Sequence, residues 1–328
     1  MDLIRLGTIG SGFIVHNILD NVMRVPGIEL EAVYSRSYER GEALAQKYGA
    51  EKVYTDMDAF LADPEVNFVY IATPNLIHYP QAKKALLAGK NVIVEKPFTT
   101  KVEHARELVE MARERGLYLI DAVPSAFLPN LEVLRQHLPE IGRIRMVMGN
   151  YSQYSSRYDK VLAGEKPNIF NWEFAGGCLM DINFYNVYTN AALFGKPDSA
   201  VYTPNIHPGL GDTSGCLTLK YDDFVSQCIG AKDTWGTNFF QIEGEKGYIY
   251  VAGDPSAIES VRVVTRQGEQ TYNLQPETNR WFYEVQEIAR LVGEGDRQAF
   301  ETRLDTMLDV IDIIEKARLD AGICFPGD

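Results

Sequence analysis

The sequence contains little cysteine, and this scarcity excludes two kinds of protein. Four cysteines occur in 328 residues, at Cys178, Cys216, Cys228 and Cys324. They lie far apart and form no C-x-x-C pair, so neither a disulfide framework nor a cysteine zinc site is indicated. The five histidines form no H-E-x-x-H motif. We therefore expect reduced thiols, no metal and a cytoplasmic location.

Long apolar runs and an excess of positive charge are also missing. No apolar run approaches the roughly 18 residues that span a bilayer. The first strand pattern begins at Leu3, so we expect no secretory signal. Basic residues number 32 against 45 acidic ones, which gives a net charge of −13. Such a chain repels phosphate backbones and anionic lipid, so we expect neither nucleic acid nor a membrane as partner.

Residues 1–122 alternate short apolar runs with helical patterns. Strands are predicted at 3–10, 28–35, 52–55, 66–74, 91–97 and 117–122, and helices at 13–25, 38–49, 57–63, 78–89 and 101–116. This alternation predicts a parallel sheet covered on both faces, and right-handed crossovers make it a doubly wound α/β fold.

The pattern changes after residue 122. Strand patterns follow one another across turn signals, at 143–154, 215–223, 224–232, 238–251 and 259–274. They predict an antiparallel sheet in an α+β domain over 123–328, with helices at 179–194, 278–292 and about 299–321. The last helix is long enough to return toward the first domain. Two such domains predict a ligand cleft between them.

A glycine-rich turn follows the first strand. Gly10 and Gly12 fit the start of the dinucleotide fingerprint, in which the backbone approaches a pyrophosphate and the helix N-terminus, here Phe13 and Ile14, binds its charge. Val15 stands where a third small residue is usual. A tight turn without a ligand is the alternative, but the position at the first strand–helix junction favours a nucleotide.

The end of the second strand, Ser35-Arg36-Ser37, carries no carboxylate. A carboxylate there would accept from the ribose hydroxyls and repel a 2′-phosphate, whereas a cation beside two hydroxyls suits that phosphate. The sequence thus favours NADP over NAD. The alternative is that Arg36 only covers the adenine.

Two more strand ends carry polar residues. Thr73, Pro74 and Asn75 lie at the tip of one buried strand, where ligands bind in open α/β sheets, and His78 begins the next helix as a cap or a ligand contact. Lys96 ends the next strand, where partial desolvation suits a lysine to proton transfer. A surface ion pair between Lys96 and Glu95 is the alternative.

The second domain offers an acid and a phenol. Gly176-Gly177 precede a predicted helix on which Asp181 and Tyr185, four residues apart, share one face. A carboxylate and a phenol together can bind a polyol hydroxyl by hydrogen bonds and protonate it. The alternative makes Tyr185 a core residue and Asp181 a helix-start charge.

Taken together, three motifs resemble the Gfo/Idh/MocA family of oxidoreductases over nearly the whole chain. They are "ATPNLIH" at 72–78, "EKP" at 95–97 and "GGCLMDINFY" at 176–185, in this order and spacing. The resemblance implies a Rossmann domain, an open antiparallel sheet in the second domain, and NAD(P). The residues that would contact or border the cofactor are Gly10, Gly12, Ser35, Arg36, Thr73, Asn75, His78, Glu95 and Lys96.

The resemblance also implies the chemistry. Lys96 matches the lysine that handles the substrate hydroxyl proton, and Asp181 matches the acid of the second motif. Tyr185 stands where many members carry histidine, so the main acid/base is Lys96 or Tyr185, and Asn183 replaces a frequent glycine. Substrates of such members are sugars, inositols or small diols. Pocket walls are expected from Tyr154, Arg157, Tyr158 and Trp172.

Apolar residues on both faces of the strands at 216–221 and 224–231 predict a homodimer through sheet faces. The favoured function is hydride transfer between nicotinamide and a CH–OH carbon. A cofactor-bound sensor without turnover, and a redox-neutral lyase or glycosidase with a tightly held cofactor, are the alternatives. Intact Lys96, Asp181 and Tyr185 favour the enzyme.

Overall fold

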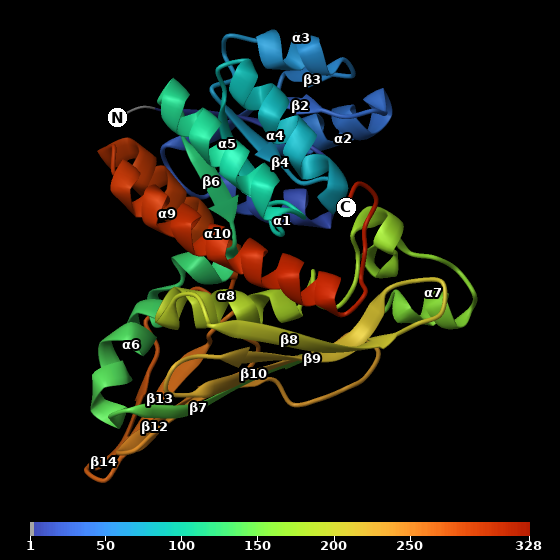
Figure 1. Ribbon diagram of the computed structural model, residues 1–328. Helices are drawn as coiled ribbons and strands as arrows, with labels where there is room; N and C mark the ends of the chain where they lie inside the picture. Colours follow the sequence, from blue (N-terminus) through green and yellow to red (C-terminus); the bar gives the residue numbers. More distant parts are fainter. Residues whose placement is uncertain (1–2) are drawn as a thin grey trace. The chain divides into compact units, whose positions relative to one another are not determined.

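A computed structural model describes residues 3–328 of the chain, which divide into two compact units (Figure 1). The first unit comprises residues up to Val123 together with Trp281–Leu308, and the second comprises Pro124–Arg280 with Asp309–Asp328. No helix within residues 3–328 combines the length and the apolar character needed to cross a membrane.

The first unit contains the predicted parallel sheet. Its strands are β1 (Ile4–Ile9), β2 (Ile28–Tyr34), β3 (Lys52–Tyr54), β4 (Phe68–Ile71), β5 (Asn91–Glu95) and β6 (Leu119–Ala122), in the order β3-β2-β1-β4-β5-β6. Every neighbouring pair is parallel. This is the Rossmann order, and it confirms the expected doubly wound fold.

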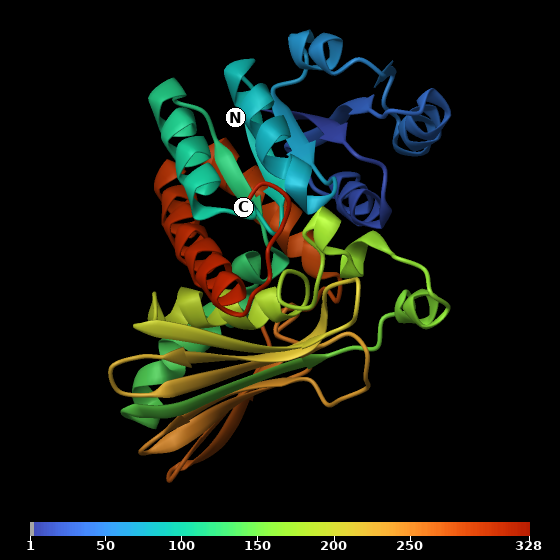
Figure 2. The same cartoon turned by 45° about the vertical axis from the view of Figure 1, so that its right-hand side comes forward.

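Helices connect these strands. They are α1 (Phe13–Val22), α2 (Tyr38–Tyr48), α3 (Met57–Ala62), α4 (His78–Leu87) and α5 (Val102–Arg115). α4 and α5 lie side by side over the sheet, as Figures 1 and 2 both show. All four residues of β4 are buried, as expected for a central strand covered on both faces.

The unit also takes in chain from the C-terminal part: α9 (Arg280–Glu294) and the first half of α10 (Arg297–Asp320). Trp281 meets Phe13 edge to face at 6.4 Å, and the guanidinium of Arg24 lies 4.7 Å from the ring centre of Phe282. These contacts place α9 against α1.

The second unit is built on an eight-stranded sheet. Its strands are β7 (Ile144–Ser152), β8 (Ser199–Ile206), β9 (Asp212–Lys220), β10 (Val225–Ala231), β11 (Phe239–Gly244), β12 (Gly247–Ala252), β13 (Ser260–Thr265) and β14 (Gly268–Tyr272). The order is β14-β13-β12-β11-β7-β10-β9-β8, and all pairs are antiparallel except β7 with β10. The sheet is therefore mixed at its centre rather than antiparallel throughout.

Three helices accompany this sheet: α6 (Pro129–His137), α7 (Tyr158–Leu162) and α8 (Asn183–Phe194). α8 packs on β10 and β7, along one face of the sheet in Figure 2. Leu217, Leu219 and Cys228 are fully buried on that face, whereas Ile229 on the other face is 39 % exposed.

One fully buried side chain of the first unit is a carboxylic acid, a group that is ionised in water at neutral pH. Asp121 of β6 is 1 % exposed, and neither of its carboxylate oxygens has a hydrogen-bond partner within residues 3–328. Burial raises the pKa of Asp121 to about 7, although the charge of Arg303 on α10 opposes the shift. The folded protein therefore favours the neutral acid.

This predicts a pH-dependent stability. Between the ordinary carboxyl pKa and about 7 the folded protein holds a proton that the unfolded chain has lost, so this group's stabilising contribution is present in acid and falls as the pH rises, by about 1.4 kcal/mol per pH unit. Asp121→Asn removes the titration. The difference in free energy of unfolding, variant minus wild type, should therefore increase from pH 5 to pH 8 in urea titrations. A difference independent of pH would contradict the assignment.

Candidate functional site

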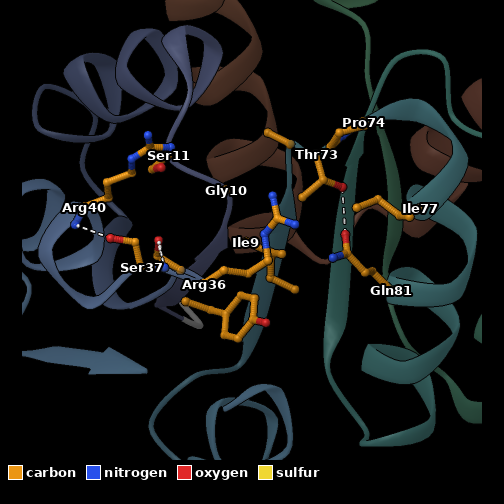
Figure 3. A pocket seen from close by; sticks show the side chains of 13 residues that line it. Ile9, Gly10, Ser11, Arg36, Ser37, Arg40, Thr73, Pro74, Ile77 and Gln81 are labelled. Atoms are coloured by element: carbon orange, nitrogen blue, oxygen red, sulfur yellow. Dashed lines mark hydrogen bonds between the residues drawn. The ribbon is translucent and has the colours of Figure 1, made fainter. Parts of the chain in front are cut away.

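A pocket of about 510 Å³ lies at the carboxyl ends of β1, β2 and β4. Figure 3 shows Ser11, Arg36, Ser37 and Arg40 on one side of it, and Thr73, Pro74, Ile77 and Gln81 on the other. The remaining lining residues are Ile9, Gly10, Tyr34, Ser35 and Ala72. The chain runs from β1 through β2 to β3 on one side and then returns to β4 on the other side of β1, so this edge is the topological switch point, where ligands bind in open α/β sheets.

The glycine turn has the geometry of a nucleotide loop. Gly10 has φ +120°, and a Cβ there would lie 2.4 Å from the carbonyl oxygen of Ala72, so only glycine fits between the ends of β1 and β4. Gly12 begins α1 without a side-chain cap, and a Cβ there would meet nothing within 4 Å. The free amides of α1 thus remain available to an anion. Val15 is fully buried and packs in the core.

Two arginines give this pocket a positive side although the chain is acidic. Arg36 follows β2 and Arg40 lies in the first turn of α2, and both line the pocket. Ser37 caps α2 by accepting from the Arg40 amide at 3.4 Å, and its hydroxyl donates to Glu39 at 2.7 Å. Ser35 is also a lining residue, buried behind them. The pocket residues therefore fit a dinucleotide with an additional phosphate.

The opposite wall is fixed by hydrogen bonds. The Thr73 hydroxyl donates to Gln81 of α4 at 2.7 Å. His78 is 1 % exposed, with Nδ1 at 2.9 Å from the Pro97 carbonyl and Nε2 at 2.8 Å from the Thr73 carbonyl. Burial lowers the pKa of His78. The imidazole therefore braces the loops after β4 and β5, and α4 begins without a side-chain cap.

Lys96 leaves the sheet directly after β5, half-buried, at the same edge as Thr73. The preceding Glu95 is 7 % exposed and accepts a hydrogen bond from the Tyr70 hydroxyl at 2.5 Å, and the Lys96 amide also donates to it at 3.2 Å. The Glu95 carboxylate is thus built into the sheet.

Several expected cofactor residues lie outside the lining set of this pocket. Phe13 is 70 % exposed at the start of α1, and Ile14 is half-buried beside it. Asn75 begins the short helical turn after Pro74. Conversely, Arg40 and Gln81 line the pocket although sequence reasoning did not select them.

In the second unit, the glycine pair enters a turn held by Asp212. Asp212 is buried, and its Oδ2 accepts from the Leu179 amide at 2.8 Å and from the Tyr202 hydroxyl at 2.7 Å. Gly177 has φ +135°, and a Cβ there would lie 2.1 Å from Asp212 Oδ1, so a side chain is excluded. The adjacent Cys178 is fully buried, and burial raises the pKa of its thiol well above the usual value. This thiol packs rather than reacts.

The helix that follows is shorter than predicted. α8 begins at Asn183, so Asp181 lies in the turn before it and does not share a helical face with Tyr185. The amides of Asp181 and Asn183 both donate to the Cys178 carbonyl, which closes the turn. Asn183 donates to the Cys228 carbonyl of β10 at 3.0 Å, so this departure from the family pattern anchors α8 to the sheet.

Asp181 has a partner that lies 51 residues away. Lys232, directly after β10, places Nζ 2.7 Å from Asp181 Oδ2. No local motif in the sequence predicts the ion pair between Asp181 and Lys232.

Tyr185 is 6 % exposed, with its ring centre 6.2 Å from that of Tyr151. The guanidinium of Arg280 lies near both phenols, and their charge contributes to a raised pKa of Arg280 against the opposing effect of burial. Tyr185 is therefore a buried phenol with a cation beside it, rather than an apolar core residue alone.

Three of the four expected pocket walls are half-buried: Tyr154, Tyr158 and Trp172. The ring centres of Tyr154 and Tyr158 lie 5.8 Å apart. Tyr158 lies 5.7 Å from Phe170, ring to ring. Tyr154 stacks on the exposed Trp235 at 5.6 Å and donates to Asp159 at 2.7 Å, whereas Arg157 points into solvent. Within residues 3–328, no group of three or more histidine, cysteine or acidic side chains is placed to hold a metal ion.

Comparison with known proteins agrees with this architecture. Residues 4–121 match the family model of the oxidoreductase family with an NAD-binding Rossmann fold, and residues 138–250 match the GFO/IDH/MocA C-terminal domain. The chain belongs to the Gfo/Idh/MocA oxidoreductase family. The resemblance drawn from the three motifs is thereby confirmed.

Relatives match along their whole length. The NADP⁺-dependent scyllo-inositol 2-dehydrogenase IolU of Bacillus subtilis is 33 % identical over 99 % of each chain. The trans-1,2-dihydrobenzene-1,2-diol dehydrogenase of Mus musculus is 28 % identical over 99 % of each. Among solved structures, the 3-ketoreductase KijD10 of Actinomadura kijaniata in complex with NADP and TDP-benzene has a TM-score of 0.83 at 22 % identity, covering 96 % of this chain and 98 % of its own. At that identity, KijD10 shares the fold.

Proposed function

We propose that this family member is an NADP-preferring dehydrogenase or reductase that acts on a CH–OH carbon of a sugar, inositol or small diol. The observation that carries the proposal is the pocket at the switch point, which the glycine turn lines together with Arg36 and Arg40. When bound, the cofactor supplies the hydride acceptor or donor.

Different residues of the pocket suit different parts of the dinucleotide. The glycine turn and the free amides of α1 suit the pyrophosphate. Arg36 and Arg40 suit a 2′-phosphate, because a guanidinium donates two parallel hydrogen bonds to phosphate oxygens. Thr73, held by Gln81, and Pro74 form the opposite wall.

Proton transfer falls to Lys96 and Tyr185, with Asp181 as a hydrogen-bond acceptor for the substrate. An ammonium at a strand end and a phenol beside a cation can each hold or release the hydroxyl proton while hydride leaves or arrives. The main acid/base is Lys96 or Tyr185. Polyols as substrates are supported by the names of IolU and the dihydrodiol dehydrogenases.

The cofactor preference is testable by thermal shift. NADP should raise the melting temperature more than NAD does at equal concentration. In Arg36→Ala and Arg40→Ala the dissociation constant for NADP should rise about tenfold or more, because a charge-assisted phosphate contact is lost, while that for NAD changes little. Arg115→Ala, at the end of α5, is the matched control. A larger stabilisation by NAD would overturn the preference.

The catalytic roles are testable by kinetics on scyllo-inositol, other inositols, aldoses and trans-diols. Lys96→Met and Tyr185→Phe should each lower kcat, by about a hundredfold or more for the main acid/base, with an unchanged thermal shift by NADP. Lys84→Met, whose lysine pairs with Asp58, is the control.

Full activity of both variants would refute these roles. If the wild-type protein binds cofactor but oxidises or reduces no member of the panel, a sensor replaces the enzyme.

The second sheet also leads us to propose a homodimer. Its outer face carries Met146, Val225 and Ile229 on adjacent strands, with Val225 registered opposite Met146. Because the inner face is already covered by α8, a second copy is the occupant that would bury this apolar face.

Light scattering should therefore give twice the chain mass. Ile229→Lys should shift the protein toward monomer, because a charge would be buried at the interface, whereas Leu162→Lys, in the exposed helix α7, should not. A monomeric wild-type protein would exclude the dimer.

A further inference from the structure

Lys232 is the most deeply buried ammonium beside a proposed catalytic group among the described residues. Its side chain is 2 % exposed, whereas that of its partner Asp181 is 24 % exposed. Nζ lies 2.7 Å from Asp181 Oδ2 and 3.3 Å from the Ile169 carbonyl, and it sits 4.6 Å from the ring centre of Phe170. The ammonium is thus surrounded by the Ile169 carbonyl, the Phe170 ring and the Asp181 carboxylate.

The backbone of Lys232 is held as firmly as its side chain. Its amide donates to the Thr213 carbonyl at 2.8 Å, and the residue follows β10, which α8 contacts through Asn183. These contacts fix the strand end that carries Lys232, and the ammonium reaches Asp181 from this fixed backbone position.

The other acids near this ammonium have donors of their own. Asp212 accepts from Leu179 and Tyr202, and Asp233 accepts from the hydroxyls of Thr213 at 2.6 Å and Ser214 at 3.2 Å. The buried thiol of Cys178 interacts with both members of the ion pair, and the phenol of Tyr151 interacts with Asp181. Asp181 is therefore the carboxylate that forms the ion pair with Lys232.

Resting on the proposed function, we propose that Lys232 is a positioning residue that holds Asp181 as an oriented carboxylate for the substrate hydroxyl. The ammonium contacts Asp181 from the buried side, and the carboxylate keeps an exposed portion. A carboxylate has about four lone-pair sites, so an oxygen bonded to lysine still accepts from a hydroxyl. Lys232 itself needs no contact with substrate.

The ion pair also sets the pH range in which this works. A carboxylate beside a fixed cation stays ionised to lower pH than one without it. Removal of the ammonium should therefore move the acid limb of the activity profile to higher pH. A role confined to folding would lower stability and leave that limb in place.

The test compares Lys232→Met and Lys232→Arg with wild type, and with Lys220→Met at the exposed end of β9 as matched control. We expect kcat/KM for the polyol to fall at least about tenfold in Lys232→Met, with the acid limb shifted upward by about one pH unit or more, and partial rescue in Lys232→Arg. The thermal shift by NADP should be unchanged in all variants, which reports folded protein.

A double-mutant cycle with Asp181→Asn separates positioning from an independent effect. If Lys232 acts through Asp181, the double variant should be no slower than Asp181→Asn alone. Additive losses, or an unshifted acid limb in Lys232→Met, would overturn the inference. A wild-type protein without turnover on the panel would instead refute the proposed function, so the two failures are distinguishable. Should Lys232→Met fail to fold, Lys232→Gln, which removes the charge but keeps a hydrogen-bond donor, decides by the same criterion.

Discussion

The parallel order of the first sheet is the constraint on which the cofactor pocket depends. Because all six strands run the same way, the residues after β1, β2 and β4 emerge at one edge. There the contact between Gly10 and the Ala72 carbonyl brings two strand ends so close that no side chain fits. The loop is then short enough to present backbone amides, and Arg36 and Thr73 become neighbours of the same cavity. The pocket is a consequence of strand direction and of one missing Cβ.

The side chains of the candidate site in the second unit are positioned in a different way. Here buried polar groups, rather than strand direction, place the side chains. Asp212 ties the glycine turn to β9 and β8 through the Leu179 amide and the Tyr202 hydroxyl. Lys232 then holds the carboxylate of Asp181, which lies in the turn before α8. Asp212 and Lys232 are buried and each has polar partners, which is the condition under which such groups specify one arrangement rather than destabilise the core.

Sequence reasoning was right where a pattern is local and periodic. The buried runs of β4 and β5, the glycine turn and the three family motifs sufficed for the fold and the family. It missed β8, because this strand is largely exposed, carries Pro204, and buries only Tyr202, so it shows no alternation. The predicted helix began at residue 179, whereas α8 begins at Asn183. The helix starts later because the amides of Cys178 and Leu179 donate to Asp212, a residue remote in the sequence. Asp212 supplies a competing acceptor that helix propensity does not contain.

The sequence by itself determined which residue types are available: a glycine turn, a strand end with arginine in place of a carboxylate, a lysine after a buried strand, and an acid four residues before a phenol. Only the tertiary structure decided what each of them touches. It made His78 a brace between two carbonyls, turned Glu95 toward Tyr70, added Arg40 to the pocket, and joined Asp181 to Lys232. The reason is physical: hydrogen bonds and ion pairs depend on distances of about 3 Å, and chain folding sets these distances between residues that no local pattern connects.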